Sequence, residues 1–412
     1  MLQHQLSSPT IRQRLRSGPF AERVDGFADW LHGHGYKRAS IDSILRSLFD
    51  WADAIQSTGI SAQECLANFT LHTTDRPAVS HVRHRHPDNK KCAASAALFI
   101  RYLRELGVMP SLPSPASPAE LWPIIGEFRA WMRQHRGLTE TTLDVYQHII
   151  AELVTALGSA PRRYTTEALR DFALKRARRH GIWRAKTVIV SVRAFLRYLG
   201  ATGQCPAGME HAIPGFASCQ HSTIPRFLPT EDVERVIDSC PAHGNGLRDK
   251  AVILLLARLG LRASEVAQLR FDDLDWEQGQ IVVSGKARRQ ERLPLPQAVG
   301  DALLNYLRQS RPPLRVPEVF TTVSAPIMPL SRAAVTRIVC RALRRAGVKA
   351  PINGAHVLRH SVATTMLRQG ASLAGIGAVL RHRSPRTTVH YAKVDITLLS
   401  EIAQPWPEVS PC

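Results

Sequence analysis

The chain has 412 residues, 44% of them hydrophobic, which is enough for two or three domains with their own cores. It has no run of 18 apolar residues and no apolar segment after its basic N-terminus, so we expect neither a membrane-spanning helix nor a secretory signal. Seven scattered cysteines without a CxxC pair argue against a disulfide framework or a zinc ribbon, and predict reduced thiols in the cytoplasm.

The net charge of +20 is the strongest global signal, with 54 Lys and Arg against 34 Asp and Glu. The basic excess is 4 in residues 1–117, 6 in 118–210 and 10 in 225–412, so it is spread over the whole chain. A protein that wraps a polyanion would distribute its charge in this way. A basic protein that is merely soluble is the alternative that charge alone leaves open.

Two stretches rich in Pro and Ser, at 109–123 and 205–225, are typical of linkers. They predict an N-terminal helical domain, a middle domain, a C-terminal domain and a short tail, at 1–112, 118–205, 225–400 and 401–412.

The first two parts look like diverged copies of one unit. FADWL at 27–31 resembles FRAWM at 128–132, and FIRYLRELG at 99–107 resembles FLRYLGATG at 195–203. Apolar residues recur at helical spacing in both parts, so each is predicted to be a bundle of about four helices. Tyr102 and Tyr198 fall within the repeated stripes, and we expect both in the core.

The third part changes character. Residues 249–269 predict a buried helix, a turn and a second helix, and a basic turn, KARRQ, joins short strands at 280–285 and 291–296. Further helices are predicted at 297–309, 331–346, 357–369 and 372–381. The expected fold class is therefore mainly α with a small β-sheet.

The sequence lacks the motifs that nucleotide hydrolysis and metal-dependent catalysis require. There is no GxxxxGKS or GxxxxGKT loop for nucleotide hydrolysis, and no acidic pair at metal-ligand spacing. The histidines of HVRHRH, at 81–86, have no cysteine partners nearby. We therefore expect no metal and no cofactor.

A different set suits chemistry at a phosphodiester, which needs cations, a proton donor and a nucleophile. Arg262 follows Gly260 at a helix–turn–helix corner, where a helix N-terminus favours anions. Glu265, one turn further, is placed to orient that guanidinium, and Lys286 lies at the tip of the hairpin. Taken singly, a surface salt bridge and a solvated turn lysine are the simpler interpretations.

A second group lies nearer the C-terminus. His356 and Arg359 share a helix face at spacing i, i+3, whereas His360 is expected to face away. His382 and Tyr391 follow in order. A tyrosine needs nearby cations to attack as a phenolate, and basic side chains surround this one at Arg381, His382, Arg383, Arg386 and Lys393.

In this order and in the contexts LGLRASE, SGK, HVLRH, LRH and HYA, these residues resemble the tyrosine recombinase (phage integrase) family. The resemblance covers 118–400, with its specific motifs in 258–394. It implies a helical, SAM-like core-binding bundle followed by a catalytic domain, here preceded by an additional bundle that looks like a copy of the core-binding unit.

The resemblance also implies a role for each residue. Tyr391 is the nucleophile that takes up the 3′-phosphate, Arg262 and Arg359 clamp its oxygens, and Lys286 protonates the leaving 5′-oxygen. His356 accepts or shares the tyrosine proton, His382 hydrogen-bonds the phosphate and Glu265 supports Arg262. Basic side chains near these positions are candidate DNA contacts, namely Arg288, Arg289, Arg381 and Arg383. The chain departs from the family at Val357, where Asp is usual, and at Arg381, where Gly is usual.

The implied function is site-specific cleavage and rejoining of double-stranded DNA through a phosphotyrosine, in integration, excision or transposition. It implies a homotetramer on two DNA sites, with or without partner recombinases, at the nucleoid of a bacterial cytoplasm. Three alternatives stay open: a type IB topoisomerase-like enzyme that relaxes DNA, a catalytically silent DNA-binding protein, and an RNA-binding or structural helical-repeat protein.

Overall fold

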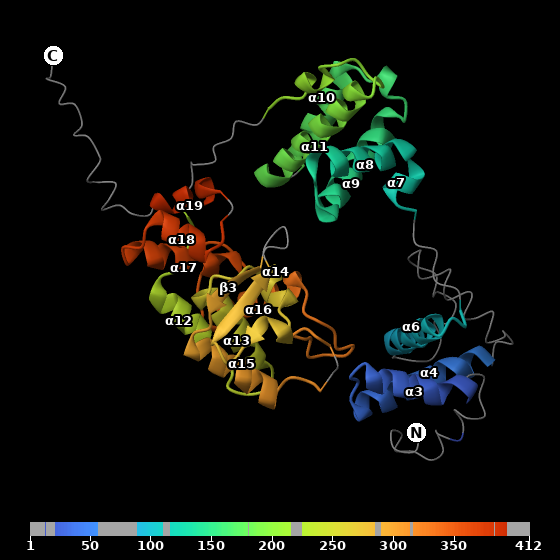
Figure 1. The fold of residues 1–412 in the computed structure, drawn as a ribbon. Coiled ribbons are helices and arrows are strands. Elements are labelled where there is room, and N and C mark those ends of the chain that lie inside the picture. The colour runs from blue at the N-terminus through green and yellow to red at the C-terminus, as the bar shows by residue number, and fades with distance from the viewer. Residues whose placement is uncertain are drawn as a thin grey trace. The chain divides into compact units, whose positions relative to one another are not determined.

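A computed structural model describes residues 13, 21–56, 89–109, 116–179, 181–215, 225–284, 290–313, 316–382 and 384–393. These residues form helices and one three-stranded sheet (Figure 1), which confirms the predicted class. By backbone contacts the chain divides into two compact units, residues 111–220 and the remainder. Among the described residues, no helix combines the length and the apolar character that crossing a membrane requires.

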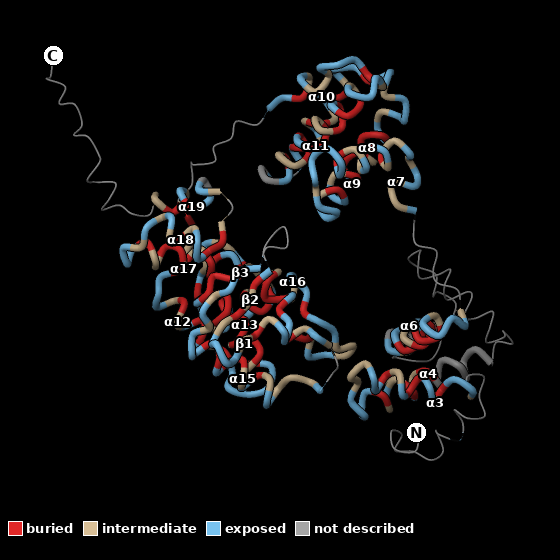
Figure 2. The backbone as a smooth tube through the Cα atoms, viewed as in Figure 1, coloured by how far each residue is buried: buried red, intermediate tan, exposed pale blue. Residues whose placement is uncertain are grey.

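The N-terminal part contributes three described helices: α3 (Ala21–Gly33), α4 (Arg38–Gln56) and α6 (Asn89–Glu105). Their facing stripes form a separate hydrophobic cluster, which appears as the buried inner sides of the three helices in Figure 2. Tyr102 is buried in this cluster, as its position in the repeated stripe predicts.

The middle part is a second bundle with its own core. Its elements are α7 (Pro118–Leu121), α8 (Pro123–Arg136), α9 (Glu140–Leu157), η1 (Pro161–Arg163), α10 (Thr166–Arg178), α11 (Ile182–Ala201) and η2 (Met209–Ala212). Gly137 ends α8 with φ 57°, a left-handed conformation that glycine adopts without strain, and Thr139 precedes α9. The four main helices confirm the predicted helical bundle, and Tyr198 is buried in its core as its place in the repeated stripe predicts.

The aromatic packing of the two bundles is repeated. The rings of Phe27 and Phe99 meet edge to face at 5.0 Å and 76°, and those of Phe128 and Phe195 at 5.2 Å and 80°. A tryptophan–tyrosine contact recurs as well, at 6.1 Å for Trp30–Tyr102 and 5.9 Å for Trp131–Tyr198. Equivalent residues therefore make equivalent contacts, which supports the predicted duplication of the unit.

The third part carries the sheet. Its strands β1 (Leu274–Asp275), β2 (Gln280–Ser284) and β3 (Gln290–Pro294) are antiparallel in the order β1-β2-β3, with Ile281 opposite both Leu274 and Leu293. Its helices are α12 (Thr230–Asp238), α13 (Asn245–Arg258), α14 (Ala263–Gln268), α15 (Gln297–Gln309), α16 (Arg332–Arg345), α17 (His356–Arg368), α18 (Leu373–Val379) and α19 (Pro385–Ala392), with η3 (Phe271–Asp273) before β1. The apolar run of α13 is buried within the main core.

Close backbone approaches bring α17, α18 and α19 together beside the end of α13 (Figure 1). A Cβ at Gly260, which has φ 57°, would lie 2.6 Å from the Leu380 side chain. A Cβ at Gly377 would lie 3.0 Å from the Thr388 hydroxyl. Glycine at these two positions therefore lets the segments that carry the candidate site residues meet.

Candidate active site

Arg359 lies at the centre of this meeting point. It comes from α17 and is buried, and it donates hydrogen bonds to the backbone carbonyls of Gly260 and Leu380. Burial lowers the pKa of Arg359 to about 10, with further lowering by the charges of Arg262 and Arg381. The Arg359 guanidinium thus links the segment before α14 to the turn after α18 through hydrogen bonds.

Arg262 precedes α14 and is tied to Glu265 in two ways. Its backbone N–H donates to Oε2 of Glu265 over 2.7 Å, and its Nη1 donates to Oε1 over 2.6 Å. Its Nη2 donates to the backbone carbonyl of Arg381 over 3.1 Å. The predicted support of Arg262 by Glu265 is therefore present, and about a third of the Arg262 side chain stays exposed.

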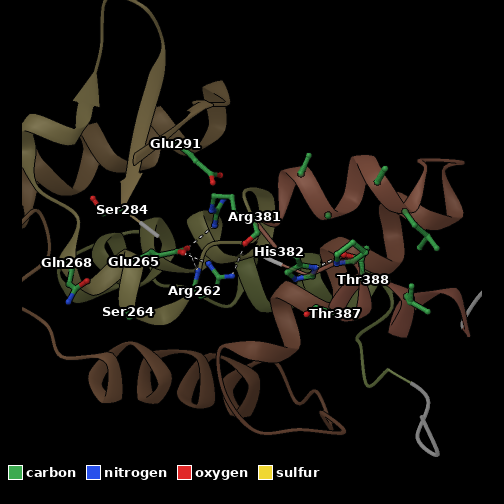
Figure 3. A pocket seen from close by; sticks show the side chains of 16 residues that line it. Arg262, Ser264, Glu265, Gln268, Ser284, Glu291, Arg381, His382, Thr387 and Thr388 are labelled. Carbon is green, nitrogen blue, oxygen red and sulfur yellow. Dashed lines mark hydrogen bonds and ion pairs between the residues drawn. The ribbon is translucent and has the colours of Figure 1, made fainter. Parts of the chain in front are cut away.

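Arg381 adopts a left-handed backbone conformation, with φ 56°. Its side chain is 2% exposed, and Nη2 donates to Oε2 of Glu265 over 2.8 Å while Nη1 donates to the Val379 carbonyl. Its buried Nε has no partner among the described residues. The residue predicted as a DNA contact thus points inward here, toward the carboxylate that also holds Arg262 (Figure 3).

Glu265 is therefore the shared anion of two arginines. Burial on its own raises the pKa of this carboxyl, but the hydrogen bond from the Arg262 backbone and the charges of Arg381 and Arg262 outweigh it, so the pKa is lowered. The side chain is 3% exposed and stays ionised at neutral pH. It offsets part of the positive charge that Arg262, Arg359 and Arg381 bring together.

A cavity of about 1380 Å³ opens beside this cluster. Its lining comes from α14, the two longer strands, α18 and α19, and Figure 3 shows Arg262, Arg381 and Glu265 converging at its wall. Ser284 and Glu291 reach it from the strands, next to the turn that joins β2 to β3. An anion in this space would meet guanidinium groups on one side.

His382 follows the turn and also lines the cavity. Its Nδ1 lies 2.8 Å from the hydroxyl of Thr388, on α19. Burial, together with the charges of Arg359 and Arg262, lowers the pKa of His382 to about 4, so the ring is neutral at pH 7. The hydrogen bond to Thr388 fixes the orientation of that ring.

Tyr391 lies on α19 and is only 3% exposed. Its hydroxyl is 2.8 Å from Nδ1 of His360, and its ring runs nearly parallel to that of His382, with centroids 6.3 Å apart. Burial raises the pKa of Tyr391 and the charge of Arg359 lowers it, with a net increase. The phenol is therefore neutral, and it is not among the described side chains that line the cavity.

The contact with His360 corrects the expectation that this histidine faces away. His356 and His360 are four residues apart, which is about 40° around a helix, so the two share a face. Their ring centroids are 6.4 Å apart, and the centroid of His360 lies 5.6 Å from that of Tyr391. The i, i+4 spacing was the signal in the sequence that could have identified it.

His356 begins α17 at an exposed position, and its pKa is lowered by partial desolvation of the ring and by the charges of Arg359 and Arg332. The next residue, Val357, is fully buried in the main hydrophobic core. An apolar side chain suits that position, which accounts physically for valine at a site where the family usually has Asp.

Four predicted residues lie outside the described ranges, namely Lys286, Arg288, Arg289 and Arg383. The described ranges contain no group of three or more His, Cys, Asp or Glu that could hold a metal ion. The structure thus brings together Arg262, Glu265, Arg359, Arg381 and His382, with Tyr391 beside them.

Comparison with known proteins gives consistent matches. The model of the phage integrase family matches residues 226–397. A putative integrase/recombinase y4rA of Sinorhizobium fredii is 33% identical over 407 residues, covering 96% of each chain. The tyrosine recombinase XerA of Pyrococcus furiosus is 29% identical over 285 residues, which covers 68% of this chain and 93% of XerA.

Two solved structures share the fold at low sequence identity. The XerH site-specific recombinase bound to its palindromic difH substrate has a TM-score of 0.54 at 20% identity, covering 76% of this chain and 89% of XerH. The Tn1549 transposon integrase bound to a circular intermediate DNA has a TM-score of 0.53 at 14% identity, covering 68% of this chain and 99% of that one.

Proposed function

Since the chain belongs to the phage integrase family of tyrosine recombinases, and is thus a site-specific recombinase that cleaves and rejoins DNA, we propose that Tyr391 is its nucleophile. The Tyr391 hydroxyl attacks the scissile phosphate and holds the 3′-phosphate as a phosphotyrosine, while a 5′-hydroxyl leaves. The covalent intermediate conserves the energy of the phosphodiester, so rejoining needs no separate energy source.

The observation that supports this proposal best is convergence. Arg262, Arg359 and His382 come from three separate segments and gather around the turn at Leu380–Arg381, with Tyr391 packed beside them. A set that is ordered in sequence and also meets in space favours one catalytic centre over unrelated surface residues.

In this proposal the cations hold the reacting phosphate. Arg262 and Arg359 bind its non-bridging oxygens, and His382 donates a hydrogen bond to it from the nitrogen that Thr388 leaves free. Glu265 keeps Arg262 in place. Arg359 already binds two carbonyls through Nη1 and Nη2, so its placement is fixed before DNA arrives.

Lys286, at the tip of the hairpin, is assigned as the acid that protonates the leaving 5′-oxygen. Arg288, Arg289 and Arg383 are assigned as phosphate contacts along the duplex, and His356 as a further ligand at the reacting phosphate. An arginine-rich surface favours such contacts because the guanidinium fork matches phosphate geometry.

The proposed architecture follows the predicted division at 1–112, 118–205 and 225–400. The middle bundle and the catalytic domain grip duplex DNA, and the N-terminal bundle contacts flanking DNA or another protomer. We further propose that the protein acts as a homotetramer on two DNA sites, with or without partner recombinases. Its place of action is the nucleoid of a bacterial cytoplasm.

Trapping the covalent intermediate tests it directly. Cells that express the full chain are lysed under denaturing conditions, protein-linked DNA is recovered, and the attached sequence is read. That sequence is then built into a nicked duplex whose short 5′ fragment diffuses away after cleavage, so that the adduct accumulates. The wild type should form the adduct without added metal or ATP, and Tyr391→Phe should form none while binding the duplex about as tightly.

A normal adduct with Tyr391→Phe would refute the nucleophile. No protein-linked DNA from cells that express the wild type would favour a silent DNA-binding protein. Efficient relaxation of supercoiled plasmid that lacks the site would favour a topoisomerase.

A further inference from the structure

We propose that His360 is the base that takes the proton from Tyr391 during cleavage and returns it during rejoining. This assignment rests on the proposed function, in which the Tyr391 oxygen attacks phosphorus. It replaces the expectation that His356 receives the tyrosine proton.

Geometry singles out His360. Its Nδ1 lies 2.8 Å from the Tyr391 hydroxyl oxygen, which is direct hydrogen-bond distance. The described ring contacts of Tyr391 are with three histidines, His360 at 5.6 Å, His382 at 6.3 Å and His390 at 6.2 Å. Among them, only His360 has a described hydrogen bond to the hydroxyl.

The neighbouring histidines are placed for other tasks. Nδ1 of His382 is already engaged by Thr388, and its ring lines the cavity beside Arg262. The centroid of the His356 ring lies 6.4 Å from that of His360. His356 is on the exposed end of α17 and has no described ring contact or hydrogen bond with Tyr391.

The surroundings keep His360 able to accept a proton. It is faced by His356 and Arg359 on its own helix, and by His390 and Tyr391 on α19. Burial first, then His356, His390 and Arg359, lower the pKa of His360 to about 4. A neutral ring that carries its hydrogen on Nε2 has a lone pair on Nδ1, which accepts from the phenol.

The step balances in both directions. As the bond from the Tyr391 oxygen to phosphorus forms, the hydroxyl proton passes to Nδ1 of His360. The bond from phosphorus to the 5′-oxygen breaks, and its electron pair stays on that oxygen, which takes a proton from Lys286 in the proposed function. During rejoining the 5′-hydroxyl attacks phosphorus and returns its proton to Lys286, the bond from phosphorus to the tyrosine oxygen breaks, and His360 returns its proton to that oxygen.

The test uses the nicked duplex built from the DNA trapped on the full chain, and the variant His360→Asn. The amide oxygen of asparagine can accept the phenol hydrogen bond near the position of Nδ1, but it cannot take up the proton. The single-turnover rate of adduct formation is measured from pH 5 to pH 10, with DNA affinity and thermal unfolding measured alongside.

The wild-type rate should be level above about pH 6, because the neutral ring is already the competent form. His360→Asn should cleave about 10²-fold more slowly at pH 7 with unchanged DNA affinity, and its rate should rise about tenfold per pH unit as hydroxide replaces the base. His356→Asn is the matched control: whatever its rate, its pH profile should keep the level shape of the wild type.

His360→Asn with the rate and profile of the wild type would overturn the assignment, as would a rising profile that appears only in His356→Asn. Tyr391→Phe in the same assay separates the two proposals, because an adduct from that variant would refute the nucleophile rather than its base.

A ring-fluorinated tyrosine at position 391 keeps the test decisive if His360→Asn folds poorly, since it leaves His360 in place. With His360 as the base the profile should stay level. A rising limb that moves to lower pH with the more acidic phenol would mean that ionised tyrosine attacks without a base.

Discussion

The two sides of the candidate active site are built in opposite ways. On the cationic side, Arg262, Arg359 and Arg381 are held by one carboxylate and by backbone carbonyls, next to an open cavity. On the tyrosine side, a neutral phenol is buried among histidines and apolar side chains. Arg359 and His360 are consecutive on α17, about 100° apart, so one helix serves both sides.

Under the proposed function, this difference gives the cationic side and the tyrosine side different tasks. Guanidinium groups attract phosphate before and during the reaction, so changes there should weaken DNA binding as well as cleavage. The tyrosine and its histidine gain a role only when the new bond forms, so changes there should lower the rate and leave affinity in place.

The largest effect is expected from Arg359→Lys. A lysine keeps the charge but cannot donate to the carbonyls of Gly260 and Leu380 while also holding a phosphate. Adduct formation should fall about 10²–10³-fold, and DNA affinity should fall too. Rates and dissociation constants on the same duplex check this, and a loss of rate with full affinity would break the proposed division.

Glu265→Gln should come next. It removes the carboxylate between Arg262 and Arg381 and leaves these two arginines without their shared ion-pair partner. We expect folding to lose about 3 kcal/mol without DNA, at the low end for breaking a buried ion pair, and cleavage to slow about 10²-fold. Because phosphate can replace the lost anion, bound DNA should raise the melting temperature of this variant more than that of the wild type. Equal shifts in both would show that the carboxylate and the phosphate do not share these cations.

Thr388→Val tests the boundary between the two sides. Valine keeps the shape of this buried residue but removes the hydroxyl that holds Nδ1 of His382. We expect adduct formation to slow about tenfold, the lower limit for losing a partner that orients a histidine ligand in metal sites. Asparagine at position 382 is the control: in that background Thr388→Val should add little.

Acid should destabilise both sides. The pKa values of His360 and His382 are lowered to about 4, whereas an exposed histidine titrates near 6.5. The unfolded chain therefore takes up these protons at a higher pH than the folded one, so the stability contributed by the neutral rings is complete above about pH 6.5 and is lost as pH falls toward 4. Thermal unfolding between pH 7.5 and 4.5 should show the decline, and asparagine at either position should reduce its slope. A flat profile in the wild type would mean that the rings titrate normally.

The elements and site residues that could be predicted are those marked by a pattern in the local sequence. Helix α15 was predicted at its observed bounds because an amphipathic stripe fixes them, whereas the two-residue strand β1 is too short to show alternation and was missed. The ordered motif predicted Arg262, Arg359, His382 and Tyr391 as site residues, and these four lie together in the structure. The i, i+4 spacing places His360 on the same face as His356, but its contact with Tyr391 depends on how α17 and α19 pack together. The inward side chain of Arg381 depends on the packing of the turn against α14, which its neighbours in sequence do not reveal.

The smallest effect is expected from Arg381→Gly, which restores the family's usual residue. Glycine removes the strain of a left-handed conformation at φ 56°, and with it a buried Nε that has no described partner. It also removes the ion pair to Glu265, which Arg262 still holds in two ways. These effects oppose one another, so stability should stay within about 2 kcal/mol of the wild type and cleavage within a few-fold. The salt dependence of DNA binding decides what Arg381 does: an inward residue leaves the slope unchanged, whereas a slope shallower by about one would mean that Arg381 turns outward and contacts a phosphate in the complex.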